Sequence, residues 1–460
     1  MGENNRAGVW LMERSLVEGS VFRNLMQFSL PYFLSYFLQT LYGLADLFII
    51  GQFGTKADVT SVSVGSQVMH ILTVMIVGLA MGATVTIGRA VGARDDKLAA
   101  SAVGGTAAVF MAGSVVLTAA LLLLRTPVAQ AMATPAQAMD GTVRYLTVCF
   151  AGIPFITAYN VISSILRGLG DSKSPMYFIA AACAVNIGLD CLFMGALGLG
   201  PAGAALGTVI SQAVSVALAL AVMLRKKGGV KLSREDFAPK RAVIGTIMRI
   251  GVPVALQDGF IQLAFIVITI IANKRGLDDA AAVGIVEKVI SMLFLVPSSM
   301  LSAVSALAAQ NFGAGKPERA RKTLLCAMAV TVGFGTVVAI AVQFAAGGIV
   351  GLFERDEAVI RLGGQYLRSY VADCVFAGVH FCFSGYFCAL EKSWISFLHN
   401  VISIVCARVP LSFAASALFP DTLFPMGLAA PAGSLLSVIV CVVAYILLRR
   451  NEKRGAQPTK

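Results

Sequence analysis

The sequence predicts an all-α polytopic membrane protein, with twelve transmembrane helices arranged as two pseudo-two-fold-related six-helix bundles. Three observations support this prediction. Of the 460 residues, 57% are hydrophobic and only 13% are charged, whereas soluble domains carry about 25% charged residues. The apolar residues are gathered into stretches long enough to cross a bilayer, and the order of these stretches is repeated once along the chain.

The apolar stretches define the expected spans. A membrane-spanning helix needs about 20 mainly apolar residues. Twelve stretches meet this requirement, in chain order 24–51, 60–87, 98–123, 141–167, 175–196, 202–225, 244–272, 280–307, 322–350, 366–390, 395–418 and 427–449. Pro and Gly occur within several of them, which membrane helices tolerate.

The loops between the stretches differ in charge. One set, which includes "RKKGGVKLSREDFAPKR" and the tail "RRNEKRGAQPTK", contains about 25 of the 36 Lys and Arg residues, and the other set about 8. The positive-inside rule places the basic set in the cytoplasm. An even number of spans then puts both termini there, so we expect a multi-pass protein of the plasma (inner) membrane. Membrane topology also explains the net charge of +12 without a nucleic-acid partner.

The N-terminal residues show no cleavable signal peptide. The first two dozen are polar and mixed in charge, and they lack the short apolar core of a secretory signal. We expect the first transmembrane helix to direct insertion.

An internal repeat of roughly 220 residues organises the chain. Four pairs of landmarks carry it: "FSLPYFLSYFLQ" with "IGVPVALQDGFIQ", "GRAVGARDD" with "AQNFGAGKP", "VRYLTV" with "GQYLRSY", and "SSILRGLGDSKS" with "SGYFCALEKS". Each copy covers six helices, so both have the same orientation, which is a transporter architecture with the substrate path between the halves. The expected parts are an N-terminal cytoplasmic segment, an N-lobe, a basic cytoplasmic linker, a C-lobe and a cytoplasmic tail, at 1–23, 24–225, 226–243, 244–449 and 450–460.

The first apolar stretch carries one carboxylate. "LPYFLSYFLQTLYGLADLFIIGQFG" begins at Leu30, and its only acidic residue is Asp46. Placing an ionised Asp at the centre of a membrane helix costs about 2.5–3.5 kcal/mol on insertion scales. Intramembrane carboxylates are therefore usually functional.

Further polar residues of the first half lie at a similar depth. At 1.5 Å per residue, Asp46 is about 8 Å below the outer end of its helix, and Asp190 and Thr208 are about 9 Å below the outer ends of theirs. Asn186 precedes Asp190 by four residues and therefore lies on the same helix face. Two carboxylates, an amide and a hydroxyl are thus expected near one another.

This set predicts a cation-coupling site. Na⁺ favours oxygen ligands, so Asp46, Asn186, Asp190 and Thr208 form a metal site if sodium is the coupling ion. The same carboxylates bind protons instead if burial and a neighbouring like charge favour their protonated forms. The alternative is that Asp46 and Asp190 only form hydrogen bonds that stabilise the bundle. Tyr42 and Gln39 lie one and two turns below Asp46, where they are expected to line the same cavity.

Pro31 is the expected hinge of the first helix. Proline removes a backbone hydrogen bond and weakens the helix locally, so a helix with both Pro31 and Asp46 can bend when the charge on Asp46 changes. The alternative is a static kink, and the matching Pro253 of the second half lacks an acidic partner.

Other charged residues within the spans belong to the second half. Asp258 and Asp373 are candidates for contact with a cationic substrate, or for local hydrogen bonds. The pair Glu287 and Lys288 is expected near the outer interface, with Lys288 reaching toward water. Arg408 is expected to pair with a carbonyl or a carboxylate between helices. The three histidines are expected to be scattered and to serve packing.

No enzymatic motif is found. The sequence lacks "GxxxxGK[ST]", HExxH, GxSxG and paired CxxC, so ATP-driven, hydrolytic and redox chemistry have no support. The nine cysteines lie mostly in apolar segments and are interpreted as small buried hydrophobes. We expect no enzyme activity and no cofactor apart from the coupling ion, Na⁺ or H⁺.

The chain resembles the MATE family, the multidrug and toxic compound extrusion transporters, from Phe28 to about Leu448. The resemblance is carried by Pro31 with Asp46, "GRAVGARD", "YNVISSILRGLGDSKSPM", "NIGLD" and "GPAGAALGTVIS", and in the second half by "GVPVALQ", "AQNFGAGKPERA" and "ARVPLS". It implies two six-helix lobes that work by alternating access and export drugs or organic cations in exchange for Na⁺ or H⁺.

The resemblance also implies site residues. Asp46, Asn186, Asp190 and Thr208 match the family's first-lobe site, while Gln39, Tyr42, Tyr145 and Asn160 match positions that line the adjacent cavity. In one branch of the family the second lobe carries a Glu in helix 7 and an Asp in helix 10. The Glu is absent here and Ala377 replaces the Asp, so we place coupling in the first lobe. The expected partners are small-molecule substrates and the bilayer, and the expected state is a monomer.

Three other functions remain open. A twelve-helix major facilitator has a similarly Gly- and Arg-rich loop after helix 2, although "GAR", "GAG" and "NIGLD" favour the MATE family. A lipid-precursor flippase on a related fold is a second alternative. A passive channel or a receptor, which is a different class, predicts no dependence on an ion gradient.

Overall fold

The structure, a computed structural model, describes residues 16–225 and 232–455. The first fifteen residues of the expected N-terminal segment, the first six of the expected linker and the last five of the expected tail lie outside these residues. The described residues form two compact units. Unit 1 comprises Met1–Ala255 with Ala309–Lys316, and unit 2 comprises Leu256–Ala308 with Pro317–Lys460.

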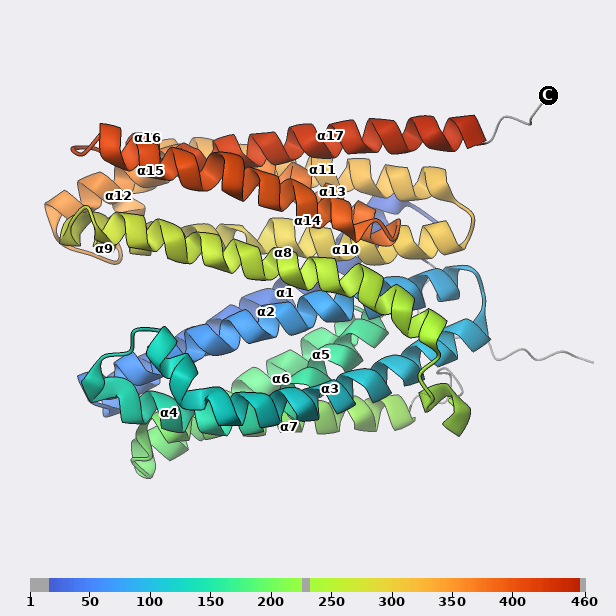
Figure 1. Cartoon of the computed structure of the whole chain (residues 1–460), viewed down its shortest axis with the longest axis horizontal. Helices are drawn as coiled ribbons and strands as arrows, with labels where there is room; N and C mark the ends of the chain where they lie inside the picture. Colours follow the sequence, from blue (N-terminus) through green and yellow to red (C-terminus); the bar gives the residue numbers. More distant parts are fainter. Residues whose placement is uncertain (1–15, 226–231, 456–460) are drawn as a thin grey trace, which may run out of the picture. The chain divides into compact units, whose positions relative to one another are not determined.

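Unit 1 is built from seven helices and the ends of two more (Figure 1). Its elements are α1 (Val21–Phe53), α2 (Lys56–Gly92), α3 (Asp96–Ala131), α4 (Ala136–Ala151), α5 (Ile153–Gly168), α6 (Lys173–Asp190), the π-helical turn η1 (Cys191–Ala196), α7 (Gly200–Arg225), the 3₁₀ turn η2 (Arg234–Phe237), the first part of α8 (Arg241–Asn273) and the last part of α10 (Leu295–Gly313).

Unit 2 has the remaining elements. They are the later part of α8, α9 (Leu277–Leu293), the first part of α10, α11 (Pro317–Gly351), α12 (Glu357–Tyr370), α13 (Asp373–Ala389), α14 (Ser393–Ser403), the π-helical turn η3 (Ile404–Arg408), α15 (Val409–Leu418), α16 (Phe424–Gly427) and α17 (Ala429–Gly455).

The predicted fold class is confirmed. In the described part of the chain, ten helical segments are long and apolar enough to cross a membrane, and two bent helix pairs raise the number to twelve. The pairs are α4 with α5, bent by 49°, and α12 with α13, bent by 43°. Each pair corresponds to one expected span, 141–167 and 366–390, and the sequence analysis did not predict the bends. Pro154 near the start of α5 explains the first bend, since it removes a backbone donor.

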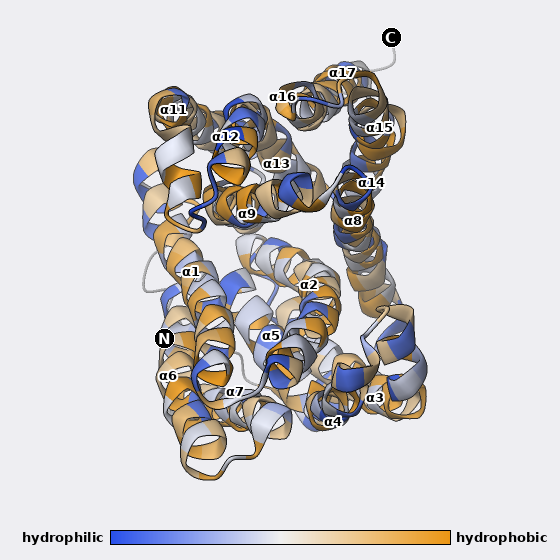
Figure 2. Ribbon diagram, turned by 90° about the vertical axis from the view of Figure 1, so that its left-hand side faces the viewer, coloured by the Kyte–Doolittle hydropathy of each residue, from blue (hydrophilic) through white to orange (hydrophobic). Residues whose placement is uncertain are grey.

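Large hydrophobic side chains cover the outside of the helices. Phe344, Leu123 and Val116 are 86%, 82% and 70% exposed. Hydrophobic residues predominate along α1 and α15 (Figure 2). Water would disfavour so much exposed apolar surface, whereas the hydrocarbon core of a bilayer solvates it. The chain is a multi-pass membrane protein.

Small residues allow α2 and α8 to pack closely in unit 1. A Cβ atom on Gly82 would lie 2.1 Å from the carbonyl oxygen of Ile247, and one on Gly251 would lie 2.2 Å from that of Leu79. Only glycine therefore permits this approach of the two backbones, in the way small residues commonly bring membrane helices together.

The turn between α1 and α2 is fixed by a capping box. The backbone amide of Thr55 donates to Oδ2 of Asp58 over 2.9 Å, and the amide of Asp58 donates to the Thr55 hydroxyl over 3.2 Å. Two amides at the start of α2 are thereby satisfied, which helps to fix where α1 ends and α2 begins.

Candidate functional site

Three helices of unit 1 carry the residues predicted to bind the coupling ion. Asp46 is on α1, Asn186 and Asp190 are on α6, and Thr208 is on α7. Helix α1 packs against both α6 and α7, and α6 packs against α7. The three helices thus bring residues that are up to 162 positions apart into one place.

The four side chains meet inside the unit. The hydroxyl of Thr208 donates a hydrogen bond to Oδ2 of Asp46 over 3.3 Å. The Asp46 carboxylate also lies close to the side chains of Asp190 and Asn186. Asp46, Asn186 and Asp190 are only 3%, 1% and 0% exposed. We name these four residues the acidic cluster of unit 1.

Most polar atoms of this cluster have no hydrogen-bond partner. Within the described residues, this holds for Oδ1 of Asp46, for both oxygens of Asp190 and for both side-chain heteroatoms of Asn186. No described Lys or Arg forms an ion pair with either carboxylate. Buried carboxylates without a partner are costly. The arrangement therefore favours uptake of a cation or a proton from outside the chain.

Gly207 makes room for the Asp190 carboxylate. A Cβ atom at position 207 would lie 2.2 Å from Oδ1 of Asp190 and 3.6 Å from Nδ2 of Asn186. Any side chain on Gly207 would displace Asp190, because α6 and α7 pack against each other here. The absence of a side chain on α7 is therefore part of the geometry of the cluster.

The helix that carries Asp190 changes its winding directly after this residue. The π-helical turn η1 begins at Cys191 and ends at Ala196. Isolated π turns within α-helices are rare and are frequently found at functional sites. Neither the composition nor the apolar periodicity of this segment predicted it.

Two of the predicted cavity residues lie within electrostatic reach of Asp46. These are Tyr42, on the same helix, and Tyr145 of α4. The hydroxyls of Tyr145 and Ser66 are 3.1 Å apart and share a hydrogen bond. A polar wall thus extends from the acidic cluster to α2 and α4.

Gln212 also belongs to this wall, and sequence reasoning missed it. Its side chain is 5% exposed, lies beside Tyr42, and leaves Oε1 without a partner. It follows Thr208 by four residues, so both lie on one face of α7. The spacing that linked Asn186 to Asp190 would have identified it.

The two other predicted cavity residues lie farther along the unit. Gln39 is beside Tyr159 of α5. Asn160 is 7% exposed and donates to the carbonyl oxygen of Ile156 in its own helix over 2.8 Å. No recorded interaction joins either of them to the four residues of the cluster, and their part in a cavity stays a prediction.

Helix α1 continues through Pro31 without a break. The hydroxyl of Ser35 donates to the carbonyl oxygen of Pro31 over 2.8 Å. This single conformation contains the proline that would permit bending, but it does not test the bending, so the hinge also stays a prediction.

Unit 2 contains a second group of buried charges. Asp373 is fully buried, and Arg408 and Glu287 lie within electrostatic reach of it and of each other. Arg408 donates to the hydroxyl of Tyr370, and the hydroxyl of Tyr366 lies 3.4 Å from Oε1 of Glu287. Arg408 was expected to bond a carbonyl or a carboxylate, and the recorded hydrogen bond is to a phenol instead.

The remaining predicted residues of unit 2 lie outside this group of charges. Asp258 is half-buried next to Gln257, and Lys288 is exposed as expected. The expectation of scattered histidines is wrong for two of them. The rings of His380 and His399 are 5.5 Å apart, because α13 and α14 pack against each other.

A metal centre built from several strong ligands is not found in the described part of the chain. No group of three or more His, Cys, Asp or Glu side chains there is arranged to hold a metal ion. The acidic cluster has only two carboxylates, which suits a weakly held monovalent cation or a proton better than a resident divalent metal.

Comparison with protein families gives one match that covers most of the chain. The family model MatE matches residues 31–192 and again residues 253–414. The two matches are displaced by roughly 220 residues, the repeat length expected from the sequence. Both aspartates and the asparagine of the acidic cluster fall within the first match, whereas Asp373 and Arg408 fall within the second.

Individual relatives are similar over nearly the full length. The chain is 28% identical to "Probable multidrug resistance protein YpnP" of Bacillus subtilis, covering 87% of this chain and 89% of the relative. It is 26% identical to "FAD transporter" of Shewanella oneidensis, covering 95% and 96%. Among solved structures, an outward-facing multidrug resistance MATE family transporter of the MOP superfamily superposes with a TM-score of 0.88 at 21% identity, covering 96% of this chain and 98% of that chain.

Proposed function

The chain belongs to the MatE family of multidrug efflux transporters, and we propose that it is a secondary active antiporter that exports its cargo in exchange for Na⁺ or H⁺ by alternating access. Family membership decides for this transporter type over the major-facilitator alternative. It also accounts for the absence of enzymatic motifs, because members of the family are transporters and not enzymes.

One observation carries the proposal of ion coupling. The acidic cluster contains two buried carboxylates. Five side-chain atoms of Asp46, Asp190 and Asn186 have no hydrogen-bond partner among the described residues, and no described Lys or Arg forms an ion pair with either carboxylate. Purely structural carboxylates in a membrane helix are expected to find hydrogen-bond or ionic partners. The unmet demand for positive charge supports a site that takes its cation from solution.

Both coupling ions suit these side chains. Na⁺ would find oxygen ligands on Asp46, Asp190, Asn186 and Thr208, as hard cations require. A proton would be shared by the two neighbouring carboxylates, since two like charges at close range resist simultaneous ionisation. Either ion removes the repulsion between Asp46 and Asp190.

Loading of the cluster can be transmitted through α1. Asp46 and Pro31 are on this one helix, and a proline removes a backbone hydrogen bond that would otherwise stiffen it. We propose that the charge on Asp46 biases α1 between two curvatures, and that this bias couples the ion to the path of the cargo along Tyr42, Gln39, Tyr145 and Asn160.

Entry of a cation also supplies energy. Moving one positive charge outward against a membrane potential costs about 2.3 kcal/mol per 100 mV. A cationic drug leaving the cell meets this cost, and a cation entering in exchange offsets it. Antiport therefore suits organic cations and amphipathic toxins, for which Asp258 and Asp373 are the proposed contacts in the second half.

The relatives guide the choice of cargo to test. One is named a probable multidrug resistance protein and another a FAD transporter. A substrate panel should therefore contain a cationic dye and flavin adenine dinucleotide. We further propose a monomer in the inner membrane with both termini in the cytoplasm.

Transport in vesicles tests the coupling. Purified protein is reconstituted into liposomes, and dye movement is followed under an imposed Na⁺ gradient at equal pH, and under a pH gradient without Na⁺. We expect one of these gradients to drive transport by the wild type, and Asp46→Asn to lose at least about 90% of it, since the substitution removes the negative charge and the carboxyl that can bind a proton.

A surface variant controls for removal of a carboxylate. Asp140 is 95% exposed and lies 3.9 Å from Arg144, and Asp140→Asn should transport like the wild type. Equal gradient-driven transport by wild type and Asp46→Asn would overturn the coupling site. Dye movement at the same rate with and without either gradient would show a passive channel instead.

A further inference from the structure

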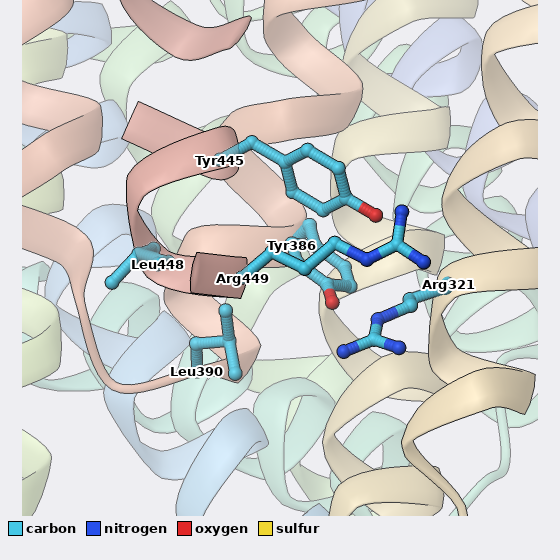
Figure 3. Close-up of a pocket in the computed structure, with 6 residues that line it drawn as sticks. All are labelled: Arg321, Tyr386, Leu390, Tyr445, Leu448 and Arg449. Atoms are coloured by element: carbon cyan, nitrogen blue, oxygen red, sulfur yellow. The ribbon is translucent and has the colours of Figure 1, made fainter. Parts of the chain in front are cut away.

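Unit 2 has a small pocket where three membrane spans end. Helix α11 begins there and α13 ends there, and α17 contributes residues from the end of its apolar stretch. Figure 3 shows the side chains that line it. They are Arg321, Tyr386, Leu390, Tyr445, Leu448 and Arg449. The proposed transport function uses none of them.

The polar side of the pocket presents two guanidinium groups. Arg321 comes from α11 and Arg449 from α17, and both side chains lie on the same side of the pocket as the tyrosine hydroxyls (Figure 3). The side chain of Arg321 is only 16% exposed, and it forms an ion pair with Glu318 one turn earlier. Arg449 is exposed and no ion pair is recorded for it among the described residues. Two guanidinium groups that line one pocket can recognise a phosphate, because each offers paired donors.

The tyrosines hold the pocket in shape. Tyr386 is 2% exposed, and its ring lies 5.9 Å from that of Tyr445 in an edge-to-face arrangement. A buried phenol contributes a hydroxyl donor at little entropic cost, because its ring is already fixed by packing. The pocket is thus partly preorganised before any ligand arrives.

The opposite side of the pocket is apolar. Leu390 and Leu448 line it, and the neighbouring Leu447 is 54% exposed. A ligand with an anionic head and an apolar body would satisfy both sides at once. A soluble anion would use only the arginines and tyrosines.

The surroundings add positive charge. Lys322, Lys392 and Arg450 are exposed near the same helix ends, and the nearby acidic residues are Glu318 and Glu391. Basic clusters at a membrane surface attract anionic lipids. By the orientation proposed above, this is the cytoplasmic leaflet.

We propose that this pocket binds the phosphate of an anionic phospholipid, held by Arg321 and Arg449 with the tyrosine hydroxyls, while its acyl chains lie along Leu448 and Leu390. The site goes beyond the ion and cargo sites of the proposed function and does not depend on them. It would link α11, α13 and α17 through a lipid at their common end.

Lipid binding to the full-length protein in detergent tests this proposal. Micelles remove the surface potential of a bilayer, so native mass spectrometry counts only lipids held by the protein. Phosphatidylglycerol, phosphatidylcholine and inorganic phosphate are compared. We expect one phosphatidylglycerol to bind about tenfold more tightly than phosphatidylcholine, and Arg321→Gln/Arg449→Gln to weaken it by about fivefold for each arginine.

A matched variant separates the pocket from its basic surroundings. Lys322→Gln/Arg450→Gln removes the same charge from exposed neighbours and should bind phosphatidylglycerol within about twofold of the wild type. If the glutamine variant of the pocket does not fold, Arg321→Lys/Arg449→Lys keeps the charge but loses the paired donors, and its preference for phosphatidylglycerol should fall severalfold. Undiminished binding by the pocket variants would overturn the proposal. Inorganic phosphate competing as well as the lipid would show a soluble-anion site instead.

Discussion

Unit 1 and unit 2 both bury acidic side chains among helices, and the two groups differ in the charge beside them. In unit 1, Asp46 and Asp190 have no described Lys or Arg as an ionic partner. In unit 2, Asp373 and Glu287 lie within electrostatic reach of Arg408. A described arginine therefore lies beside one group of carboxylates, whereas no described Lys or Arg pairs with the other.

The two groups also share a local feature. The π-helical turn η1 begins directly after Asp190, and η3 ends at Arg408. A π turn rotates the residues that follow it relative to a regular helix. In both units, the turn adjoins a charged residue on the fifth span of its repeat, the buried Asp190 or the half-buried Arg408. What distinguishes the units is thus the arginine and not the helical framework, and four experiments can break or sharpen this comparison.

The largest effect is expected from removing the cation of unit 2. Arg408→Gln would leave the buried Asp373 and the half-buried Glu287 without a positive neighbour, and breaking a buried ionic group in this way costs about 3–5 kcal/mol. Thermal unfolding in detergent should show a clear loss of stability. The exposed Arg361 of α12 supplies the control, since Arg361→Gln should change stability by no more than about 0.5 kcal/mol. A stable Arg408→Gln protein would mean that the unit 2 carboxylates are neutral without it.

The next effect is expected from the ion that loads unit 1. An ion that binds only the folded protein stabilises it by about 2.7 kcal/mol at a concentration 100 times its Kd. We expect Na⁺, or lower pH if the ion is H⁺, to stabilise the wild type, and Asp46→Asn to abolish this response. The experiment is a thermal unfolding series in Na⁺, in choline and at several pH values.

Asp373→Asn gives the contrast for the ion response. Because the acid that it removes lies beside Arg408 in unit 2, the stabilisation by Na⁺ or H⁺ should persist in this variant. If Asp373→Asn lost the response and Asp46→Asn kept it, the assignment of the ion site to unit 1 would be reversed.

A smaller effect is expected from filling the space at Gly207. Gly207→Ala places a methyl group where Oδ1 of Asp190 now lies, and overpacking of this kind typically costs about 1–3 kcal/mol. Displacement of Asp190 should weaken the ion response together with stability. Gly188→Ala is the control, because a Cβ atom there would have nothing within 4 Å. Normal ion response in Gly207→Ala would show that the position of Asp190 is not critical.

The sequence predicted the spans and all four residues of the acidic cluster for a simple physical reason. Depth along a helix follows from counting residues at 1.5 Å each, so Asp46, Asp190 and Thr208 were assigned to one level. Proximity across helices in unit 2 depends on how each helix is rotated about its axis. The proximity of Glu287, Tyr366 and Arg408 therefore could not be predicted by counting residues along the sequence.

The bends show the same limit. Pro154 in "AGIPFITA" was a visible signal for the bend between α4 and α5. The break between α12 and α13 falls at Val371 and Ala372, which are ordinary helix residues. Nothing in the sequence at these two positions predicts a bend.

The smallest effect is expected at Asp236, a carboxyl outside the membrane spans. Asp236 lies in the 3₁₀ turn η2, outside the membrane spans, and Ser233 caps the start of this turn. Oδ2 of Asp236 accepts hydrogen bonds from the backbone amide and the hydroxyl of Ser233, both over 2.8 Å. These bonds, the backbone one first, hold the pKa of Asp236 below its usual value. A carboxyl whose folded pKa is depressed contributes stability above its unfolded pKa and loses it as the pH falls through the folded pKa.

Hydrogen exchange at the Ser233 amide should therefore be slow at neutral pH and lose its protection only below about pH 4, with Asp236→Asn showing weak protection throughout. Unlike the buried carboxylates of the acidic cluster, this one accepts hydrogen bonds from its own turn and lies near Lys240, so its removal should leave ion-dependent stabilisation unchanged. A changed ion response in Asp236→Asn would mean that the linker, and not only α1, α6 and α7, contributes to the state that binds the ion.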